Sequence, residues 1–193
     1  MFINYEDREL NCKIVYCGPP LAGKSTNLKY VHERTSPETR GKLITLRNAT
    51  GSTVFFDFLT VLEVRGYRVR LHLYTYRAPE LDDPGRSLVL KGLDAVVFVA
   101  DSQPHRMEEN KSALGILQRD LEADGRPLDA LLFLFQYNKR DLPKTLPIAE
   151  LERALNLTGA PSFEAVASEG KGVFDTLKEL SRRLVLRAGG RHA

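Results

Sequence analysis

The sequence predicts an α/β fold in three layers, with helices on both faces of a mostly parallel, six-stranded sheet. Strongly apolar segments of strand length, such as 94–100 and 131–135, alternate along the chain with amphipathic segments of helix length, such as 106–123. Continuous apolar runs are typical of strands buried on both faces, and their alternation with helices is typical of a doubly wound sheet. The 193 residues, 42% of them apolar, suit a single domain with a sizeable core.

The expected strands and helices follow one another in a regular order. The segment 66–75 alternates apolar and polar residues, and residues 63–66 join it to 53–60, which predicts a hairpin with 53–60 as an antiparallel edge strand. Residues 1–10 are expected as an N-terminal extension that leads into the first strand, and the sequence leaves open a short edge pairing of their own. The turn-rich stretch 35–52 is expected as a mobile loop, and 188–193 as a flexible tail. The other strands are expected at 11–17, 94–100, 131–135 and 162–167, and the helices at about 26–34, 85–91, 106–123, 147–155 and 173–187.

The composition narrows the classes of function. The net charge is +3, and Lys and Arg are spread among acidic residues, so nothing indicates a nucleic-acid surface. Cys12 and Cys17 lie on one predicted strand, too far apart for a disulfide at about 3.3 Å per residue. Because we find no signal peptide, no apolar stretch of about 18 residues and no lipidation motif, we expect a reduced, cytoplasmic protein without a stable membrane anchor.

The stretch between the first strand and the first helix reads G-x-x-x-x-G-K-S and predicts a phosphate-binding loop. Its two glycines let the backbone turn successive N–H groups toward phosphate oxygens, and the following helix directs its positive dipole end to the same place. The lysine brings a positive charge to the outer phosphates, and the serine hydroxyl is placed to ligate Mg²⁺. The predicted phosphate-binding residues are Gly18, Pro19, Pro20, Leu21, Ala22, Gly23, Lys24, Ser25 and Thr26.

A second motif, Asn138-Lys139-Arg140-Asp141, follows a predicted buried strand and resembles the base-recognition motif of GTPases. The Asp141 carboxylate can accept hydrogen bonds from the N1–H and N2–H₂ groups of guanine, where adenine would present an acceptor. The Lys139 stem can lie over the ring, and Asn138 can tie this loop to the phosphate loop. After the last strand, Ala167 and Ser168 resemble the short loop whose backbone N–H meets guanine O6, so the expected ligand is GTP or GDP.

With three nucleotide motifs in order over about residues 11–175, the chain resembles the Ras-like small GTPases, and it is identified as a member of the MglA family, bacterial GTPases of gliding motility and cell polarity. The resemblance implies a P-loop NTPase fold, GTP or GDP with Mg²⁺ as ligands, and a GTP-driven shift of the second strand. It also implies a roadblock-type, MglB-like homodimer as activating partner of a chain that is monomeric alone. The matching strings include Phe55-Phe-Asp-Phe58, Leu71-His-Leu-Tyr-Thr75, Val97-Phe-Val-Ala-Asp101-Ser and Glu169-Gly-Lys-Gly-Val-Phe174.

The departures from the Ras-like pattern fall at the residues of hydrolysis. Thr75 stands in place of an aspartate, which is a trait of the MglA family, and Ala78 replaces a glycine but keeps an N–H for the γ-phosphate. Pro79 stands where the glutamine that positions the attacking water is expected, and proline has neither a polar side-chain atom nor an N–H. Ser52 stands where the family has an arginine that stabilises the transition state. Two other arginines, Arg47 and Arg77, could substitute only if the loops rearrange.

Two readings of the function therefore stay open: a GTPase switch whose hydrolysis is slow at best, and a pseudo-GTPase that holds nucleotide as a scaffold. Thr53 is the expected sensor of the γ-phosphate and Mg²⁺, with Thr50 as a rival. Asp57 is a candidate to hold Mg²⁺ through water and, equally well, a solvent-facing carboxylate. Phe55 and Phe58 on the expected edge strand are expected to meet an effector or the roadblock dimer. A P-loop kinase or ATPase conflicts with the guanine-reading carboxylate.

Overall fold

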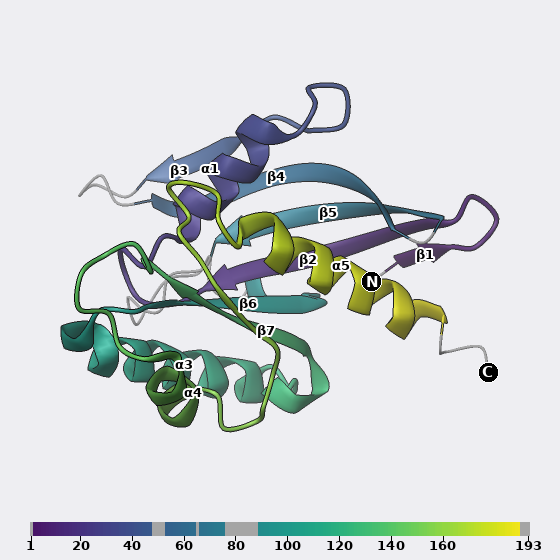
Figure 1. Cartoon of the computed structure of the whole chain (residues 1–193). Helices are drawn as coiled ribbons and strands as arrows, with labels where there is room; N and C mark the ends of the chain where they lie inside the picture. The colour runs from purple at the N-terminus through teal and green to yellow at the C-terminus, as the bar shows by residue number, and fades with distance from the viewer. Residues whose placement is uncertain (1, 48–52, 65, 76–88, 190–193) are drawn as a thin grey trace.

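The computed structural model describes residues 2–47, 53–64, 66–75 and 89–189, and of residues 45–47, 53–62, 64 and 129 only the backbone. Within this part of the chain eight strands form one sheet in the order β3-β4-β5-β2-β6-β7-β8, with β1 paired to β2 (Figure 1). The strands are β1 (Phe2–Asn4), β2 (Glu9–Cys17), β3 (Ile44–Arg47), β4 (Thr53–Val64), β5 (Tyr67–Thr75), β6 (Ala95–Asp101), β7 (Leu132–Asn138) and β8 (Ser162–Glu164).

The centre of the sheet is β2. It runs parallel to β5 over Glu9–Tyr16 and parallel to β6 over Ile14–Cys17, and β6, β7 and β8 continue in parallel. β4 runs antiparallel to β5 as the predicted hairpin, whose last pair is Val64 with Tyr67. All six predicted strands are therefore present in a mostly parallel sheet with β4 antiparallel, which confirms the α/β, Ras-like fold class. β1 and β3 are two short additions to it.

The strand β3 corrects the prediction of a loop throughout 35–52. Its residues 44–47 pair antiparallel with Thr53–Asp57 of β4, with a shift of register between Leu46 and Arg47. The surrounding sequence is rich in turn residues, but pairing with β4 satisfies the backbone groups of this short apolar piece, so tertiary context overrides local propensity. As a result β4 is not the outermost strand over residues 53–57, where an exposed edge was expected.

The last strand, β8, is shorter than the predicted 162–167. The Ala165 N–H still donates to Tyr137 O at 2.8 Å, as the last bond of the ladder with β7. The backbone then curls around the end of β7, where Ala165 O accepts from the N–H of Arg140 in the following loop at 3.1 Å. The apolar run Ala165–Ala167 stays buried, which is why its sequence looks like a strand. This curl brings residues 165–168 to the loop that follows β7.

Helices cover both faces of the sheet, with α1 (Lys24–Arg34) and α5 (Val173–Gly189) on one face and α3 (Met107–Ala123) and α4 (Ile148–Leu155) on the other (Figure 1). Each face has its own apolar core, formed by residues such as Ile14, Leu28, Leu73 and Leu177 on the first and Phe98, Leu117, Phe135 and Leu151 on the second. Short 3₁₀ turns, η1 (Pro104–Arg106) and η2 (Leu128–Ala130), precede α3 and β7. The helices predicted after β2, β6, β7 and β8 are confirmed, whereas the one expected at 85–91 lies mostly outside the described residues.

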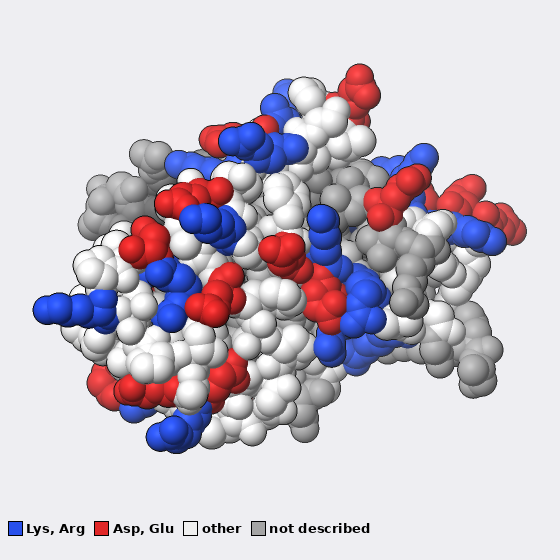
Figure 2. Space-filling view, in the orientation of Figure 1, with Lys and Arg blue, Asp and Glu red and all other residues white. Residues whose placement is uncertain are grey.

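The predicted N-terminal extension is part of the sheet, because β1 pairs antiparallel with β2 from Phe2 with Asn11 to Asn4 with Glu9. Cys12 and Cys17 are buried and unpaired, and burial raises the pKa of the Cys12 thiol to about 12. Acidic and basic side chains are interspersed on the face shown in Figure 2. Among the described helices we find none with the length and apolar composition needed to cross a membrane.

Candidate nucleotide-binding site

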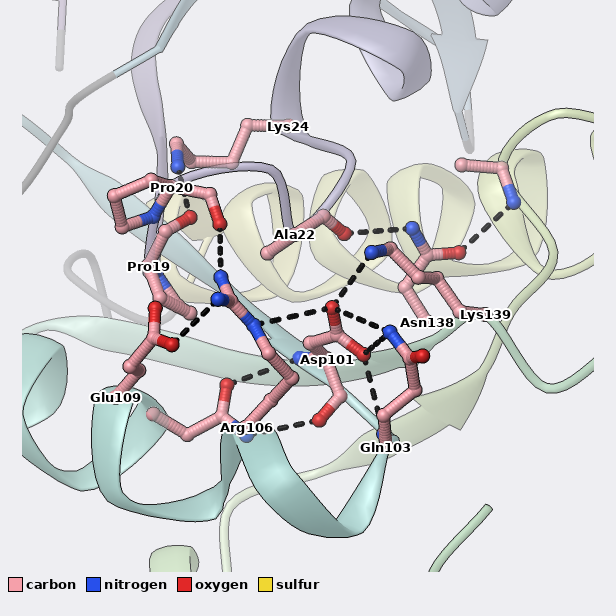
Figure 3. Close-up of polar contacts among 12 residues, drawn as sticks. Pro19, Pro20, Ala22, Lys24, Asp101, Gln103, Arg106, Glu109, Asn138 and Lys139 are labelled. Atoms are coloured by element: carbon pink, nitrogen blue, oxygen red, sulfur yellow. Dashed lines mark hydrogen bonds and ion pairs between the residues drawn. The ribbon is translucent and has the colours of Figure 1, made fainter. Parts of the chain in front are cut away.

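The three nucleotide motifs lie together because the strands that precede them are neighbours in the sheet. β2, β6 and β7 are parallel, so their carboxyl ends open on one edge, the usual place of ligand sites in such sheets. The phosphate loop follows β2, Asp101 ends β6, and the loop 138–141 follows β7. Figure 3 shows side chains from all three converging there.

The phosphate loop is shaped by glycines that no other residue could replace. Gly18 has φ +136°, and a Cβ there would lie 2.2 Å from Val99 O on the neighbouring strand. Gly23 has φ +102°, and its Cβ would lie 2.1 Å from Asn138 Nδ2. Both are conformations that favour glycine and approaches that leave no room for a side chain. Both glycines thus have positive φ and allow close packing, whereas their role in turning N–H groups toward phosphate oxygens stays a prediction.

The predicted phosphate lysine is held at the mouth of this loop. The Lys24 side chain is 8% exposed, and its Nζ donates to Gly18 O at 2.8 Å and to Pro19 O at 2.6 Å. The ammonium thus connects the end of the loop to its beginning. Its three N–H donors can leave these carbonyl oxygens and bind phosphate oxygens instead. The following residues begin α1, where Ser25 is half-buried and Thr26 exposed. Amide N–H groups at a helix N-terminus suit an anion.

Asn138 joins its own loop to the phosphate loop, as the sequence suggested, and also to the loop after β8, which the sequence did not suggest. Its Nδ2 donates to Ala22 O in the phosphate loop at 2.8 Å, and its Oδ1 accepts from the Ala167 N–H at 2.9 Å. The Asn138 side chain is 2% exposed. Without it, Ala22 O and the Ala167 N–H would lie unpaired in the interior. We call this Ala22–Asn138–Ala167 connection the amide tether. In this structure it occupies the Ala167 N–H, the group expected to meet guanine O6, and the next residue, Ser168, is exposed.

Lys139 is fixed by a second connection. It has the left-handed φ of +65°, unusual for a residue with a side chain, and its Nζ lies 2.6 Å from Asp101 Oδ2. The Asp101 carboxylate is fully buried and also accepts from the N–H and Nε2 of Gln103 through Oδ1, both at 3.1 Å. Asp101 thus caps the loop that follows β6 and also anchors the lysine expected over the base.

The base-reading aspartate lies at the open end of this loop. Asp141 is exposed, and the residue before it holds the loop in place: Arg140 Nε donates to Glu164 Oε2 at 2.9 Å and Nη1 to Leu146 O at 2.7 Å. The pKa of Lys171 is raised, chiefly by its hydrogen bond with Glu169 and to a smaller extent by the Asp141 charge. The loop after β8 packs against the loop that carries Asp141, since the Ala167 N–H bonds to Asn138 and the Arg140 N–H bonds to Ala165 O.

The 168–172 loop is also fixed against α1 and β8. Gly170 has φ +80°, and a Cβ there would overlap the Tyr30 ring, with Tyr30 Cζ at 1.9 Å. Tyr30 in turn packs edge-on against Phe174 of α5, with ring centroids 6.2 Å apart. This packing connects the base loop to the helix that follows the phosphate loop.

The residues proposed for Mg²⁺ and hydrolysis are only partly described. Of Thr53 and Asp57 the structure gives the backbone, with Thr53 paired to Arg47 and Asp57 to Ile44 and Tyr74. The remaining predicted positions lie outside the described residues: Thr50, Ser52, Arg77, Ala78 and Pro79.

One observation fits a hydrated cation at this edge of the sheet. Thr75, the residue in the aspartate position, is 3% exposed, and within the described part of the chain its hydroxyl has no hydrogen-bond partner. It ends β5, directly beside the end of β2 from which the phosphate loop leaves. An unpaired hydroxyl and the half-buried Ser25 hydroxyl are suitable neighbours for Mg²⁺ that keeps several waters. No cluster of three or more His, Cys, Asp or Glu side chains among the described residues could hold a metal by itself.

Arg106 is the residue that the sequence analysis missed. It lies in η1, its side chain is 16% exposed, and its Nη2 donates to Pro20 O in the phosphate loop at 2.6 Å while Nε lies 3.6 Å from Asp101 Oδ2 (Figure 3). Nη1 pairs with Glu109. No motif marks this position. The only available signal was its place a few residues beyond the end of a strand expected beside the phosphate loop.

Comparison with known proteins shows the family of this chain. No protein family model matches the chain. Over 193 residues it is 49% identical to the mutual gliding-motility protein MglA of Myxococcus xanthus (strain DK1622), covering 98% of this chain and 99% of that protein. Over 101 residues it is 34% identical to ADP-ribosylation factor-like protein 4C of Homo sapiens and of Mus musculus, covering 49% of this chain and 50% of each relative. The chain therefore belongs to the MglA family of Ras-like, GTP-binding small GTPases.

Proposed function

We propose that this protein is a cytoplasmic switch of the MglA type that binds GTP and GDP with Mg²⁺ and hydrolyses GTP slowly. The observation that carries the proposal is the amide tether, because one buried side chain connects the phosphate loop, the Asn-Lys-x-Asp loop and the loop after β8. A polar turn with a chance resemblance to the base motif would have no reason to be buried against the phosphate loop. Because the chain belongs to the MglA family, and because its Myxococcus relative is named a gliding-motility protein, we propose a role in gliding motility and cell polarity.

The residues act on the nucleotide in separable ways. Loop amides and the Lys24 ammonium hold the phosphates, and the Asp141 carboxylate selects guanine through its two N–H donors. The Lys139 stem, whose ammonium is held by Asp101, would lie along the guanine ring. Ser25, Thr53 and Asp57 would hold Mg²⁺. When bound, the ion neutralises charge on the β- and γ-phosphate oxygens.

Slow hydrolysis follows from Pro79 and Ser52. Proline offers nothing with which to orient a water, and serine supplies no positive charge to the transition state. An arginine in that role is worth about 10³–10⁵ in rate, and intrinsic turnover in Ras-like proteins is already about 10⁻⁴ per second. The same two residues support the second candidate, a scaffold that holds GTP or GDP without useful turnover.

Single-turnover GTP hydrolysis with Mg²⁺ tests this proposal. The unaltered protein is expected to turn over no faster than about 10⁻⁴ per second, and the Pro79→Gln, Ser52→Arg double variant is expected to be faster. If the unaltered protein hydrolyses GTP as fast as the variant, another residue positions the water, and Arg47 and Arg77 become the next to replace. If both are inert while both bind GTP, the scaffold function is favoured.

We further propose a roadblock-type homodimer of the MglB kind as regulator, contacting β4 through Phe55 and Phe58. Because β3 pairs with residues 53–57, a partner reaches this region through side chains or beyond Asp57, not along a bare strand edge there. Phe55→Ala is expected to leave GDP affinity intact and to weaken binding of an MglB-type dimer. Loss of GDP affinity in this variant would show that the ring belongs to the core.

A further inference from the structure

We propose that Arg106 is a positioning residue for nucleotide binding: it orients the Pro20–Leu21 peptide so that the Leu21 N–H faces the phosphates. The proposal rests on the proposed function, since it concerns how this loop receives GDP or GTP. Its evidence is the contact of Arg106 Nη2 with Pro20 O, at 2.6 Å and in a part-buried setting. Arg106 comes from η1, a different element of the chain from the loop that it contacts.

The geometry of a peptide bond turns this contact into an orientation. A trans peptide is planar, and its C=O and N–H groups point in opposite directions. When Arg106 holds Pro20 O on the α3 side of the loop, the N–H of Leu21 must point away from that side. In a phosphate loop, amides that point inward cradle the phosphates. Holding a carbonyl on the outside is therefore a way of presenting an amide on the inside.

The conformation of Leu21 explains why such a hold is needed. Leu21 has φ +61°, a conformation that is unfavourable for a residue with a Cβ and persists only where its surroundings enforce it. Its side chain is 83% exposed, so packing of the leucine does not enforce the conformation. The Arg106 guanidinium, which binds Pro20 O in the peptide just before Leu21, can enforce this conformation.

Asp101 extends the same hold to the base loop. The carboxylate lies 3.6 Å from Arg106 Nε and 2.6 Å from Lys139 Nζ, and Lys139 is another residue with a side chain at positive φ, +65°. We call the Pro20–Arg106–Asp101–Lys139 connection the charged tether. One end of this tether thus lies directly before Leu21 in the phosphate loop, and the other is Lys139 in the loop expected to contact the base. Arg106 itself contacts only the phosphate-loop end, and Asp101 holds the base-side lysine.

The test compares GDP with GMP, which lacks the second phosphate, on the full-length protein with Mg²⁺. Arg106→Ala removes a charge-assisted hydrogen bond, so its affinity for GDP should fall roughly 10- to 100-fold, while its affinity for GMP should change little. The ³¹P resonance of the β-phosphate in bound GDP should also shift, which a change confined to stability would not cause. Arg106→Lys keeps the charge but loses the fork that reaches Pro20 O and Asp101 together, so it should be intermediate.

Arg182→Ala is the matched control, because it removes an arginine from an ion pair with Glu179 on α5, away from the site. It should leave the affinity for both nucleotides unchanged. Equal losses of GDP and GMP affinity in Arg106→Ala, or an unchanged ³¹P resonance, would overturn the inference and leave the proposed function standing. If the unaltered protein itself fails to bind GDP, the proposed function fails, and this inference fails with it.

Discussion

Two tethers hold the phosphate loop to the loop after β7, residues 138–141, and they differ in their chemistry. The amide tether uses one neutral side chain, Asn138, whose donor and acceptor are both satisfied by backbone groups. The charged tether uses Arg106 and Lys139 on either side of the fully buried Asp101 carboxylate. Both reach the phosphate loop, at Ala22 O and at Pro20 O respectively.

Because one tether is neutral and the other is charged, removing each of them should have a different consequence. A neutral amide costs little to bury once paired, but its loss leaves a carbonyl and an N–H unsatisfied in the interior. A buried carboxylate is expensive to desolvate and is tolerated because two cations and two N–H donors surround it. We therefore expect the amide tether to govern stability and affinity together, and the charged tether to act more on the shape of the nucleotide site.

The largest expected effect comes from a variant that prevents the close packing of Gly23 against Asn138. In Gly23→Ala the new Cβ would lie 2.1 Å from Asn138 Nδ2 at φ +102°, so affinity for GDP, measured by calorimetric titration, should fall by more than about 100-fold. Gly159→Ala is the matched control, since it has φ +64° with open space around the Cβ position. An unchanged affinity in Gly23→Ala would show that the loop adapts and that the close packing is dispensable.

Asn138→Ala removes the amide tether itself. Two buried backbone groups lose their partners, so the free energy of unfolding should fall by about 2–4 kcal/mol and GDP affinity by roughly 100-fold. Asn156 makes the same kind of clamp elsewhere, donating to Ala160 O at 2.7 Å and accepting from the Ala160 N–H at 2.8 Å. Asn156→Ala should therefore destabilise the fold in urea titrations but keep GDP affinity. Equal losses of affinity in both variants would contradict a specific role for Asn138.

Asp101→Asn tests the charged tether with a smaller expected effect. The variant keeps the size of the side chain but replaces one acceptor oxygen by a donor NH₂ and leaves two cations without their counter-ion, which should lower GDP affinity by about tenfold. Because the carboxylate is fully buried, this loss should persist at high salt. GDP titrations at low and high ionic strength check both points. A loss that disappears at high salt would mean that the effect is long-range attraction and not a local hold.

The smallest expected effect comes from the ion cluster of Glu179 with Arg182 and Arg183 on α5, a partly exposed counterpart to the buried charged tether. The hydrogen bond from Arg182, and then that from Arg183, lowers the pKa of Glu179 to about 2 from its ordinary 4.5. Because the folded-state value is the lower one, the contribution is present above about pH 4.5 and is lost as the pH falls toward 2. Glu179→Gln should cost less than about 1 kcal/mol at pH 7, since the arginines are exposed. Thermal unfolding of both proteins from pH 7 to pH 2 should show the difference shrinking.

Sequence patterns predicted most of this fold because they are local. Buried strands, amphipathic helices and the phosphate-loop glycines each leave a periodic or motif signature, and the Asn138 connection followed from the order of motifs along parallel strands. β3 and the end of β8 were predicted wrongly because their conformations are decided by pairing partners far away in the sequence. Arg106 was missed for the same reason, since only the adjacency of β2 and β6 brings it to Pro20.

The central claim, that this edge of the sheet reads guanine, is tested most directly by exchanging the base preference. GDP, ADP and xanthosine diphosphate are titrated with Mg²⁺ into the unaltered protein and into Asp141→Asn. We predict that the unaltered protein binds GDP and rejects ADP. In Asp141→Asn the new amide N–H can donate to the C2 carbonyl of xanthine but cannot accept from the donors of guanine. The variant should therefore prefer xanthosine diphosphate to GDP. Equal affinity for GDP and ADP, or undiminished GDP affinity in Asp141→Asn, would contradict the account.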